Sequence, residues 1–333
     1  MEEEKRFADL GKEEALNELY KVSKYKRKPE IRFEGSGGSI YTASALLLEG
    51  MDFNLVYFPL KHLGYKSVIN VTGMLYASLA RPKTLQVRLG VSSKLDFPQV
   101  KEIWTGIITA AAEHGYADVD LDLAPSLNGL TIALSATGET PKLTVVRRTK
   151  PKSKDLVCVS GSLGAAYLGM QALEREFKDL EKYRMIIGDY LKPELPTGLP
   201  EHFENEEIYP SSGYWISHGL SDAVKRLARD TGLGVKIYAD KIPFEGNSFE
   251  LGKRLDIDPV SAAFNGGDDC RLLFTIPILQ LEKFRREFQA FDIIGHLAQE
   301  EVGAVLVTPE GVELPIHAQG WKDSCLDANT SNL

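Results

Sequence analysis

The chain has 333 residues, of which 43% are hydrophobic and 26% charged, and its net charge is -8. This length is sufficient for two globular domains, each with its own buried core. The negative charge would repel a polyanion, which argues against a nucleic-acid partner.

Cysteine content and hydropathy indicate the cellular compartment in which the protein is expected. Cys158, Cys270 and Cys325 are too few and too scattered for a disulfide framework or a zinc-binding pair, which favours a reducing cytoplasm. The acidic N-terminal stretch differs from a signal peptide. No apolar run approaches the ~18 to 20 residues that a membrane helix requires. We therefore expect a cytoplasmic protein without a membrane partner.

The first half of the sequence alternates between helical and strand patterns. Residues 2–30 read as a charged helix followed by a basic stretch, and a Gly/Ser loop after residue 34 leads into a strand. Residues 97–114 place apolar side chains at helical spacing, which predicts a helix packed on a sheet. The segments TLQVRLGVS, YADVDLDLA and GLTIALSATGE read as strands. The pattern predicts a mixed α and β domain.

A basic connector at 147–154 opens the second half. The strand DLVCVSG runs into a small-residue turn and then a long helix ending near residue 187. The prolines and acids of 188–213 predict an exposed connection, a candidate lid that cannot sustain a helix. We expect an N-terminal extension (1–30), two domains (31–148 and 149–323) and a frayed polar tail (324–333).

Two acidic clusters are candidates for metal binding. Asp118, Asp120 and Asp122 alternate along a predicted strand, so their carboxylates share one side. Such a row of carboxylates could bind magnesium. It is equally typical of a solvent-exposed edge strand whose charges discourage aggregation. Asp268 and Asp269 lie in the glycine turn NGGDDC and point in different directions, so at most one of them serves a given ion. A plain turn accounts for those glycines as well.

Two further turns are candidates for binding an anion. CVSGSLGAAYLG places Gly161 and Gly164 before a helix whose free N–H groups suit an anion, although helix–sheet packing also requires small residues there. In WISHGLSDAV, Ser217 is a predicted N-cap, and the amides that follow it suit a phosphate. His218 favours an anion when protonated, and it is a poor magnesium ligand because that ion prefers hard oxygen donors. A purely structural histidine is the alternative.

The order of these segments resembles that of the thiamine-monophosphate kinases. From about residue 34 to 321 the matching motifs are NVTGMLYASLARP, the Asp122 stretch, Arg148, DLVCVSGSLGAAYLG, LKPE, WISHGLSDAV, DKIP, NGGDDCRLLFTIP, IIGH and QGW. The resemblance implies an α/β (α+β) protein with the two-domain aminoimidazole ribonucleotide synthetase-like fold, and a homodimer formed through the first domain. It also implies ATP and magnesium as cofactors, in a transfer of the γ-phosphoryl group of ATP onto thiamine monophosphate.

The sequence departs from the family motifs mainly at acidic positions. Trp215 and His218 stand at the two acids of the family's D-I-S-D-G-L, Ser162 at the acid of G-D-L-G, and Gly73 at the acid of N-x-S-D. Arg271 reverses a charge in G-G-E-D-Y-E-L-L. Phosphoryl transfer between two anions depends on metal ions that aspartates hold, so these losses concern the chemistry directly.

The leading interpretation is a catalytically impaired relative that binds a nucleotide or another phosphate-bearing ligand, or acts as a scaffold. One alternative is an active kinase that uses the remaining aspartates, and another is a different ATP-dependent reaction of the superfamily. The candidate residues for binding the cofactor are Arg148, Gly161, Gly164, Ser217, His218 and Gly219. The candidate metal ligands are Asp122, Asp268 and Asp269.

Overall fold

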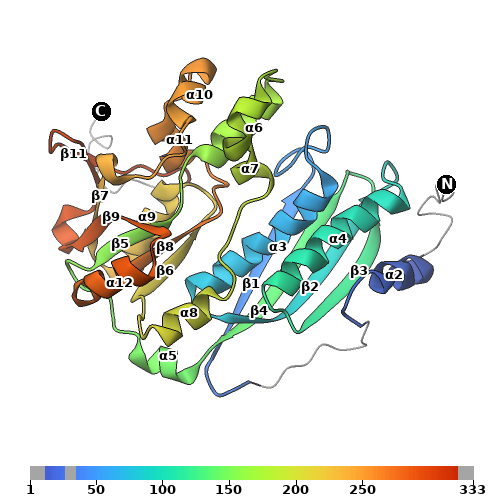
Figure 1. Ribbon diagram of the computed structural model, residues 1–333, viewed down its shortest axis with the longest axis horizontal. Coiled ribbons are helices and arrows are strands. Elements are labelled where there is room, and N and C mark those ends of the chain that lie inside the picture. Colours follow the sequence, from blue (N-terminus) through green and yellow to red (C-terminus); the bar gives the residue numbers. More distant parts are fainter. Residues whose placement is uncertain (1–11, 27–34, 322–333) are drawn as a thin grey trace, which may run out of the picture. The chain divides into compact units, whose positions relative to one another are not determined.

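The computed structural model describes residues 12–26 and 35–321, which form two compact units (Figure 1). One unit contains the described residues up to Thr149 together with Leu191–Tyr209. The other contains Lys150–Tyr190 and the described residues from Pro210 onward. The chain thus leaves the second unit once and returns to it.

The first unit is a four-stranded sheet with helices on one face. Its elements are α2 (Lys12–Lys21), β1 (Ser39–Leu48), α3 (Leu60–Ala77), β2 (Arg81–Ser92), α4 (Phe97–Glu113), β3 (Asp118–Ser126), β4 (Thr131–Thr140), α5 (Lys142–Arg147) and α8 (Leu199–Asn205). The strand order is β1-β4-β2-β3, in which β2 and β3 are parallel and the other pairs antiparallel. These elements confirm the predicted mixture of helices and strands.

Helices α3 and α4 lie side by side over the sheet (Figure 1). The predicted apolar stripe of α4 is buried throughout, and Trp104 lies at its centre. Asp96 and Gln99 form a capping box at the start of α4. The two helices approach closely at Gly64 and Gly106, where an added Cβ would lie 2.0 Å from the carbonyl oxygen of Ile103 and 1.9 Å from that of Lys61, respectively.

Helix α2 covers the edge of the sheet at β3. The buried hydroxyl of Tyr20 donates to the carbonyl oxygen of Val119 (3.1 Å) and accepts from the amide of Leu121 (3.0 Å). The indole N–H of Trp104 donates to the carbonyl oxygen of Leu19 (2.7 Å). A single side chain therefore satisfies backbone groups that an edge strand otherwise leaves unpaired.

The second unit contains a seven-stranded sheet. Its elements are β5 (Leu156–Ser160), α6 (Ala165–Glu174), η1 (Leu180–Tyr183), α7 (Arg184–Leu191), β6 (Ser212–Ile216), α9 (Leu220–Thr231), β7 (Gly234–Tyr238), η2 (Ala239–Lys241), α10 (Ser248–Leu255), α11 (Pro259–Asn265), β8 (Arg271–Ile276), η3 (Ile278–Gln280), α12 (Leu281–Glu287), β9 (Phe291–Ala298), η4 (Glu300–Val302), β10 (Ala304–Val307) and β11 (Glu313–Pro315). The strand order is β11-β10-β7-β9-β5-β8-β6.

Most neighbours in this sheet are antiparallel, and β10 and β7 are a parallel pair. Apolar side chains of β5, β6, β7 and β8 pack with α9 and α11 into one core. The fully buried Val159, Leu220 and Leu273 belong to it. This core fixes the ends of β5, β6 and β8, from which the turns of the candidate site emerge.

Two sequence predictions about the second half are wrong. The segment expected to be one long helix is divided into α6, η1 and α7, because Glu176 adopts a positive φ of 50° and the chain turns back. Gly169 permits this return, since a Cβ there would lie 2.6 Å from the carbonyl oxygen of Ile186 in α7.

The second error concerns 188–213, expected to be an exposed connection without a helix. It contains α8, which begins after Gly198 and carries Pro200 in its first turn, where proline is compatible with a helix. Leu199 and Phe203, four residues apart, are buried. The i, i+4 pair therefore gives this short segment an apolar face.

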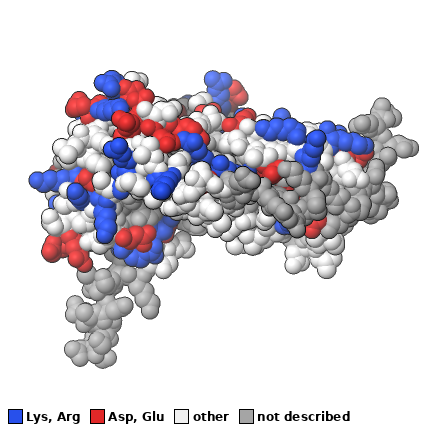
Figure 2. Space-filling view, turned by 90° about the horizontal axis from the view of Figure 1, so that it is seen from below, with Lys and Arg blue, Asp and Glu red and all other residues white. Residues whose placement is uncertain are grey.

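The expectations of no membrane partner and no nucleic-acid partner stay predictions. None of the described helices combines the length and apolarity needed to cross a membrane. On the face shown in Figure 2, acidic and basic side chains lie interspersed on the left, and a group of basic side chains follows the upper edge on the right.

Candidate functional site

Three turns meet at one end of the sheet in the second unit. β8 lies between β5 and β6 and is antiparallel to both, so the ends of β5 and β6 and the start of β8 share an edge. We call the residues 160–164, 215–219 and 266–271 the turn cluster. It brings together the predicted Gly161, Gly164, Ser217, His218 and Gly219 with the acids at 268 and 269.

Asp269 occupies the N-terminus of α6. Its carboxylate oxygens accept the backbone N–H groups of Gly164 (2.9 Å) and Ala166 (3.3 Å), and its side chain is buried. Burial raises the pKa of Asp269 to about 7, against the lowering effects of these N–H groups and of Arg271. The acceptor expected at this helix terminus is therefore a carboxyl group of the protein itself.

The 215–219 turn differs from its predicted capping geometry. Gly219, with φ 87°, is the N-cap of α9, and no side chain caps the helix. Ser217 Oγ instead lies 2.9 Å from Nδ1 of the exposed His218, while its carbonyl oxygen accepts the amide of Asp268 (2.7 Å). Gly219 is required because a Cβ there would lie 2.3 Å from the carbonyl oxygen of Phe264. The prediction that Ser217 caps α9 is wrong.

A buried ion pair completes the turn cluster. Arg271 Nη2 donates to Asp189 Oδ1 (2.8 Å), and Ser162 Oγ donates to Asp189 Oδ2 (3.0 Å). Arg271 Nε also donates to the carbonyl oxygen of Ser162 (3.3 Å). The side chains of Arg271 and Asp189 are only 9% and 21% exposed. Two positions at which the sequence departs from the family motifs are thus linked through one carboxylate.

The sequence patterns place Asp189 in the exposed connection 188–213 and do not predict its role beside the turn cluster. A usable signal was present, because an arginine at the start of an otherwise apolar strand predicts a buried carboxylate partner. The sequence does not show which carboxylate, since Asp189 and Arg271 are 82 positions apart.

The Gly/Ser loop of the first unit also binds a carboxylate of the chain. The amides of Ser36 and Gly38, and the Ser36 hydroxyl, donate to Glu139 Oε1 at 2.6, 3.2 and 2.9 Å, respectively. Glu139 is 2% exposed. This loop, like the N-terminus of α6, therefore binds a carboxyl group of the chain itself.

The remaining predicted residues, Asp122 and Arg148, belong to the first unit. Asp122 lies with Asp118 and Asp120 on one side of the edge strand β3, which confirms the shared face. Asp120 pairs with Arg88 (2.7 Å). Arg148 follows α5, and its NH1 donates to the carbonyl oxygen of Ser78 (3.4 Å).

The turn cluster does not fit a magnesium ion held by several carboxylates. Asp269 directs both oxygens to backbone N–H groups, Asp189 is held by Ser162, and the guanidinium of Arg271 places a cation where further acids would be needed. Among the described residues, no three His, Cys, Asp or Glu side chains are grouped so as to hold a metal ion.

Curated relatives share most of the chain. A thiamine-monophosphate kinase of Pyrococcus horikoshii is 31% identical over 243 residues, 70% of each chain. The thiamine-monophosphate kinase of Aquifex aeolicus is 26% identical over 279 residues, covering 83% of this chain and 85% of its own length. No protein-family model matches the chain.

Solved structures show the fold. AaThiL complexed with AMPPCP and TMP has a TM-score of 0.70 at 22% identity and covers 93% of this chain and 96% of its own. HypE of E. coli, a hydrogenase maturation protein, has a TM-score of 0.70 at 15% identity, covering 92% and 98%. The protein has the aminoimidazole ribonucleotide synthetase-like fold, and with the relatives above this chain belongs to the thiamine-monophosphate kinase family.

Proposed function

We propose that this chain binds a nucleotide or another phosphate-bearing ligand without carrying out metal-dependent phosphoryl transfer, and that it serves as a binding or scaffold protein. The observation that carries the proposal is the Arg271–Asp189–Ser162 arrangement. A fixed guanidinium in this position repels a divalent cation and leaves Asp189 without a free oxygen pair.

Two sites of backbone N–H groups, at the N-terminus of α6 and in the Gly/Ser loop, support the same proposal because carboxyl groups of the chain already occupy them. Asp269 and Glu139 hold the backbone N–H groups that suit a phosphate, so a ligand would have to displace a buried carboxylate to use them. The exposed His218, next to Ser217, remains accessible at the start of α9. We therefore place the ligand's phosphate at His218, with ATP as the first candidate because AaThiL has been solved with AMPPCP.

A second candidate function is an active kinase. The observation that favours it is the row Asp118, Asp120 and Asp122 on one side of β3, a concentration of hard oxygen donors. The ion pair between Arg88 and Asp120 opposes it, because the guanidinium competes with a metal ion for that carboxylate. A third possibility, another ATP-dependent reaction of the superfamily, is consistent with the likeness to HypE.

Thermal unfolding with ATP, with and without Mg²⁺, separates the first two candidates. A ligand that binds only the folded state raises the melting temperature. We expect ATP to give the same shift in the presence and absence of Mg²⁺. Formation of thiamine diphosphate from ATP and thiamine monophosphate, above the level given by heat-inactivated protein, would overturn the proposal.

A pair of substitutions tests the role of the turn cluster. Ser162→Asp with Arg271→Glu returns acids to both positions, next to Asp189. We expect this variant to acquire an Mg²⁺-dependent shift with ATP. The matched control is Arg229→Glu, because Arg229 makes an exposed ion pair with Asp230 away from the turn cluster. An Mg²⁺-dependent shift of equal size in the wild type contradicts the assignment.

We also propose that the chain forms a homodimer through the face of the first sheet opposite α3 and α4. Three of the five exposed side chains of β1 are apolar: Ile40 is 58%, Leu46 59% and Leu48 38% exposed. Analytical ultracentrifugation should show a dimer, and Leu46→Glu should convert it to a monomer. A wild type that sediments as a monomer at tens of micromolar would refute the dimer.

A further inference from the structure

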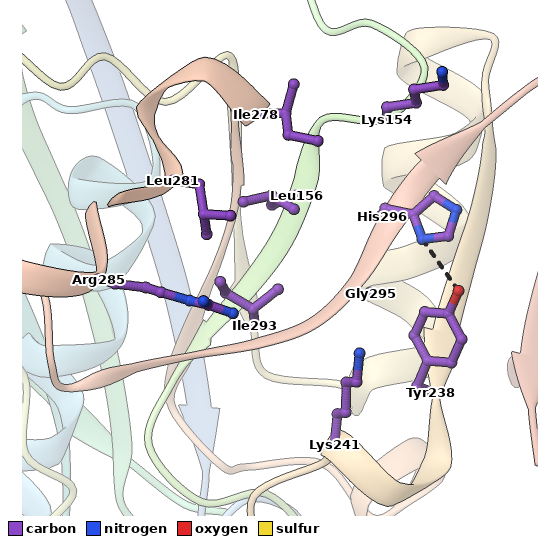
Figure 3. Close-up of a pocket in the computed structure, with 10 residues that line it drawn as sticks. All are labelled: Lys154, Leu156, Tyr238, Lys241, Ile278, Leu281, Arg285, Ile293, Gly295 and His296. Carbon is purple, nitrogen blue, oxygen red and sulfur yellow. Dashed lines mark hydrogen bonds between the residues drawn. The ribbon is translucent and has the colours of Figure 1, made fainter. Parts of the chain in front are cut away.

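A cavity lies in the second unit at the start of β5 and is shown in Figure 3. It has a volume of about 340 Å³ and lies beside Leu156, the first residue of β5. The turn cluster begins at the last residue of this strand, roughly 13 Å away for four residue steps of extended chain. The volume is within the range of ~300 to 1,000 Å³ that is typical of small-molecule sites.

The floor of the cavity is apolar. Leu156 of β5 and Ile293 of β9 lie at its centre, and Ile278 and Leu281 enclose it on the side of η3 and α12 (Figure 3). The pairing of β5 with β9 shifts register between Val157 and Cys158, opposite the segment 293–295. Such an irregularity re-aims side chains and is frequent beside binding sites.

Cations surround this apolar floor. Lys154, Lys241 and Arg285 come from three different segments and line the cavity, and none of the ten lining residues is acidic. Arg285 and Lys241 point toward the middle of the cavity (Figure 3). In the part of the chain that the structure describes, the charged groups of these three side chains form no ion pair.

Tyr238 and His296 form the remaining wall. Their rings stack with centroids 5.8 Å apart, and Tyr238 OH lies 3.4 Å from His296 Nδ1 (Figure 3). Lys241 Nζ lies over the Tyr238 ring, 4.6 Å from its centroid. Burial, Lys236 and Lys241 lower the pKa of His296, so the imidazole stays neutral near pH 7 and is available for a hydrogen bond. The wall therefore presents polar groups beside the apolar floor.

We propose that this cavity is a binding site for a phosphate monoester with a compact apolar body. The apolar group would contact Ile278, Leu281 and Ile293, and the phosphate would lie between Lys241 and Arg285. Three cations in a cavity whose lining includes no acidic residue suit a dianion better than a carboxylate, and the guanidinium matches phosphate geometry. The site is separate from the turn cluster.

Fluorescence titration of the full chain with 1-naphthyl phosphate tests this site, with inorganic phosphate and 1-naphthol as partial ligands. Both partial ligands should bind at least about tenfold more weakly, since each lacks one of the two contacts, worth ~1.4 kcal/mol or more. Ile278→Glu places a negative charge among the cations and should lower the affinity for 1-naphthyl phosphate by at least about tenfold. Leu279→Glu is the matched control: the neighbouring Leu279 is 96% exposed and does not line the cavity.

The outcomes distinguish the possible sites. Unchanged affinity for 1-naphthyl phosphate in Leu279→Glu, with weakened binding in Ile278→Glu, supports the proposal. Equal affinity for inorganic phosphate and 1-naphthyl phosphate would overturn it, since the apolar floor would then play no part. Binding that is lost in His218→Ala and kept in Ile278→Glu would place the probe at the turn cluster and would also overturn it.

Discussion

Replacing Arg271 by methionine should destabilise the second unit specifically. The change keeps an aliphatic side chain but removes the 2.8 Å bond to Asp189 and the 3.3 Å bond to the carbonyl oxygen of Ser162. Breaking one side of a buried ion pair costs about 3–5 kcal/mol. The Asp189 side chain is 21% exposed and keeps the Ser162 hydroxyl, so we expect about 2–3 kcal/mol.

A double-mutant cycle isolates the pair. Asp189→Asn alone should cost less, because the amide oxygen can still accept one hydrogen bond, and the double variant should fall short of the sum of the two single costs by about 1–2 kcal/mol. Amide hydrogen exchange of peptides from β8, followed at increasing urea concentrations, measures the free energy of opening of the second unit separately from that of the first. Arg229→Met, which removes an exposed ion pair with Asp230, is the control and should change stability by less than about 1 kcal/mol. Equal costs for Arg271→Met and Arg229→Met, or additive single variants, would refute the reasoning.

Three further changes test other features. Tyr20→Phe leaves an N–H and a carbonyl group of β3 without a hydrogen bond and should lower the free energy of unfolding by about 1–3 kcal/mol. Amide hydrogen exchange in β3 measures this loss. Exchange protection equal to that of the wild type would count against the bridging role of the hydroxyl. Folding raises the pKa of Asp269 to about 7 from the ~3.9 of an unfolded chain, so its contribution is complete below about pH 4 and is lost as the pH rises through about 7. Asp269→Asn should therefore lower the pH dependence of urea midpoints between pH 4 and 8; identical slopes in both proteins would contradict this. Gly219→Ala should lower the melting temperature more than Gly232→Ala, because both glycines have positive φ but only the first meets a carbonyl oxygen; equal losses would show that the close approach is unimportant.

The sequence predicted most of the fold because local patterns decide it. The stripe of α4 and the alternation in β3 each depend on residues close together in the chain. The glycine turns identified the ends of β5 and β8, and the family resemblance supplied their arrangement. Helix α8 was missed because prolines and acids dominate its composition, although Leu199 and Phe203 give it a buried face.

The partners of the turns could not be predicted in the same way. The amide of Gly164 bonds a carboxylate 105 positions away, and that of Ser36 one 103 positions away. Sequence spacing carries no information about such pairs, so a loop that binds a ligand and a loop that binds an internal side chain read alike. For the same reason Asp189 was assigned to a connection, although it neutralises Arg271.

The position of α2 also bears on how molecules of this protein can associate. A four-stranded sheet has two edge strands to which another polypeptide could add a strand, and Tyr20 blocks the edge at β3. Through strand addition to this sheet, two copies can therefore join at the remaining edge, at β1, but this sheet alone cannot extend the pair into a fibre. Deleting the first 21 residues would expose the edge at β3 as well and permit head-to-tail polymerisation through the two edges of this sheet.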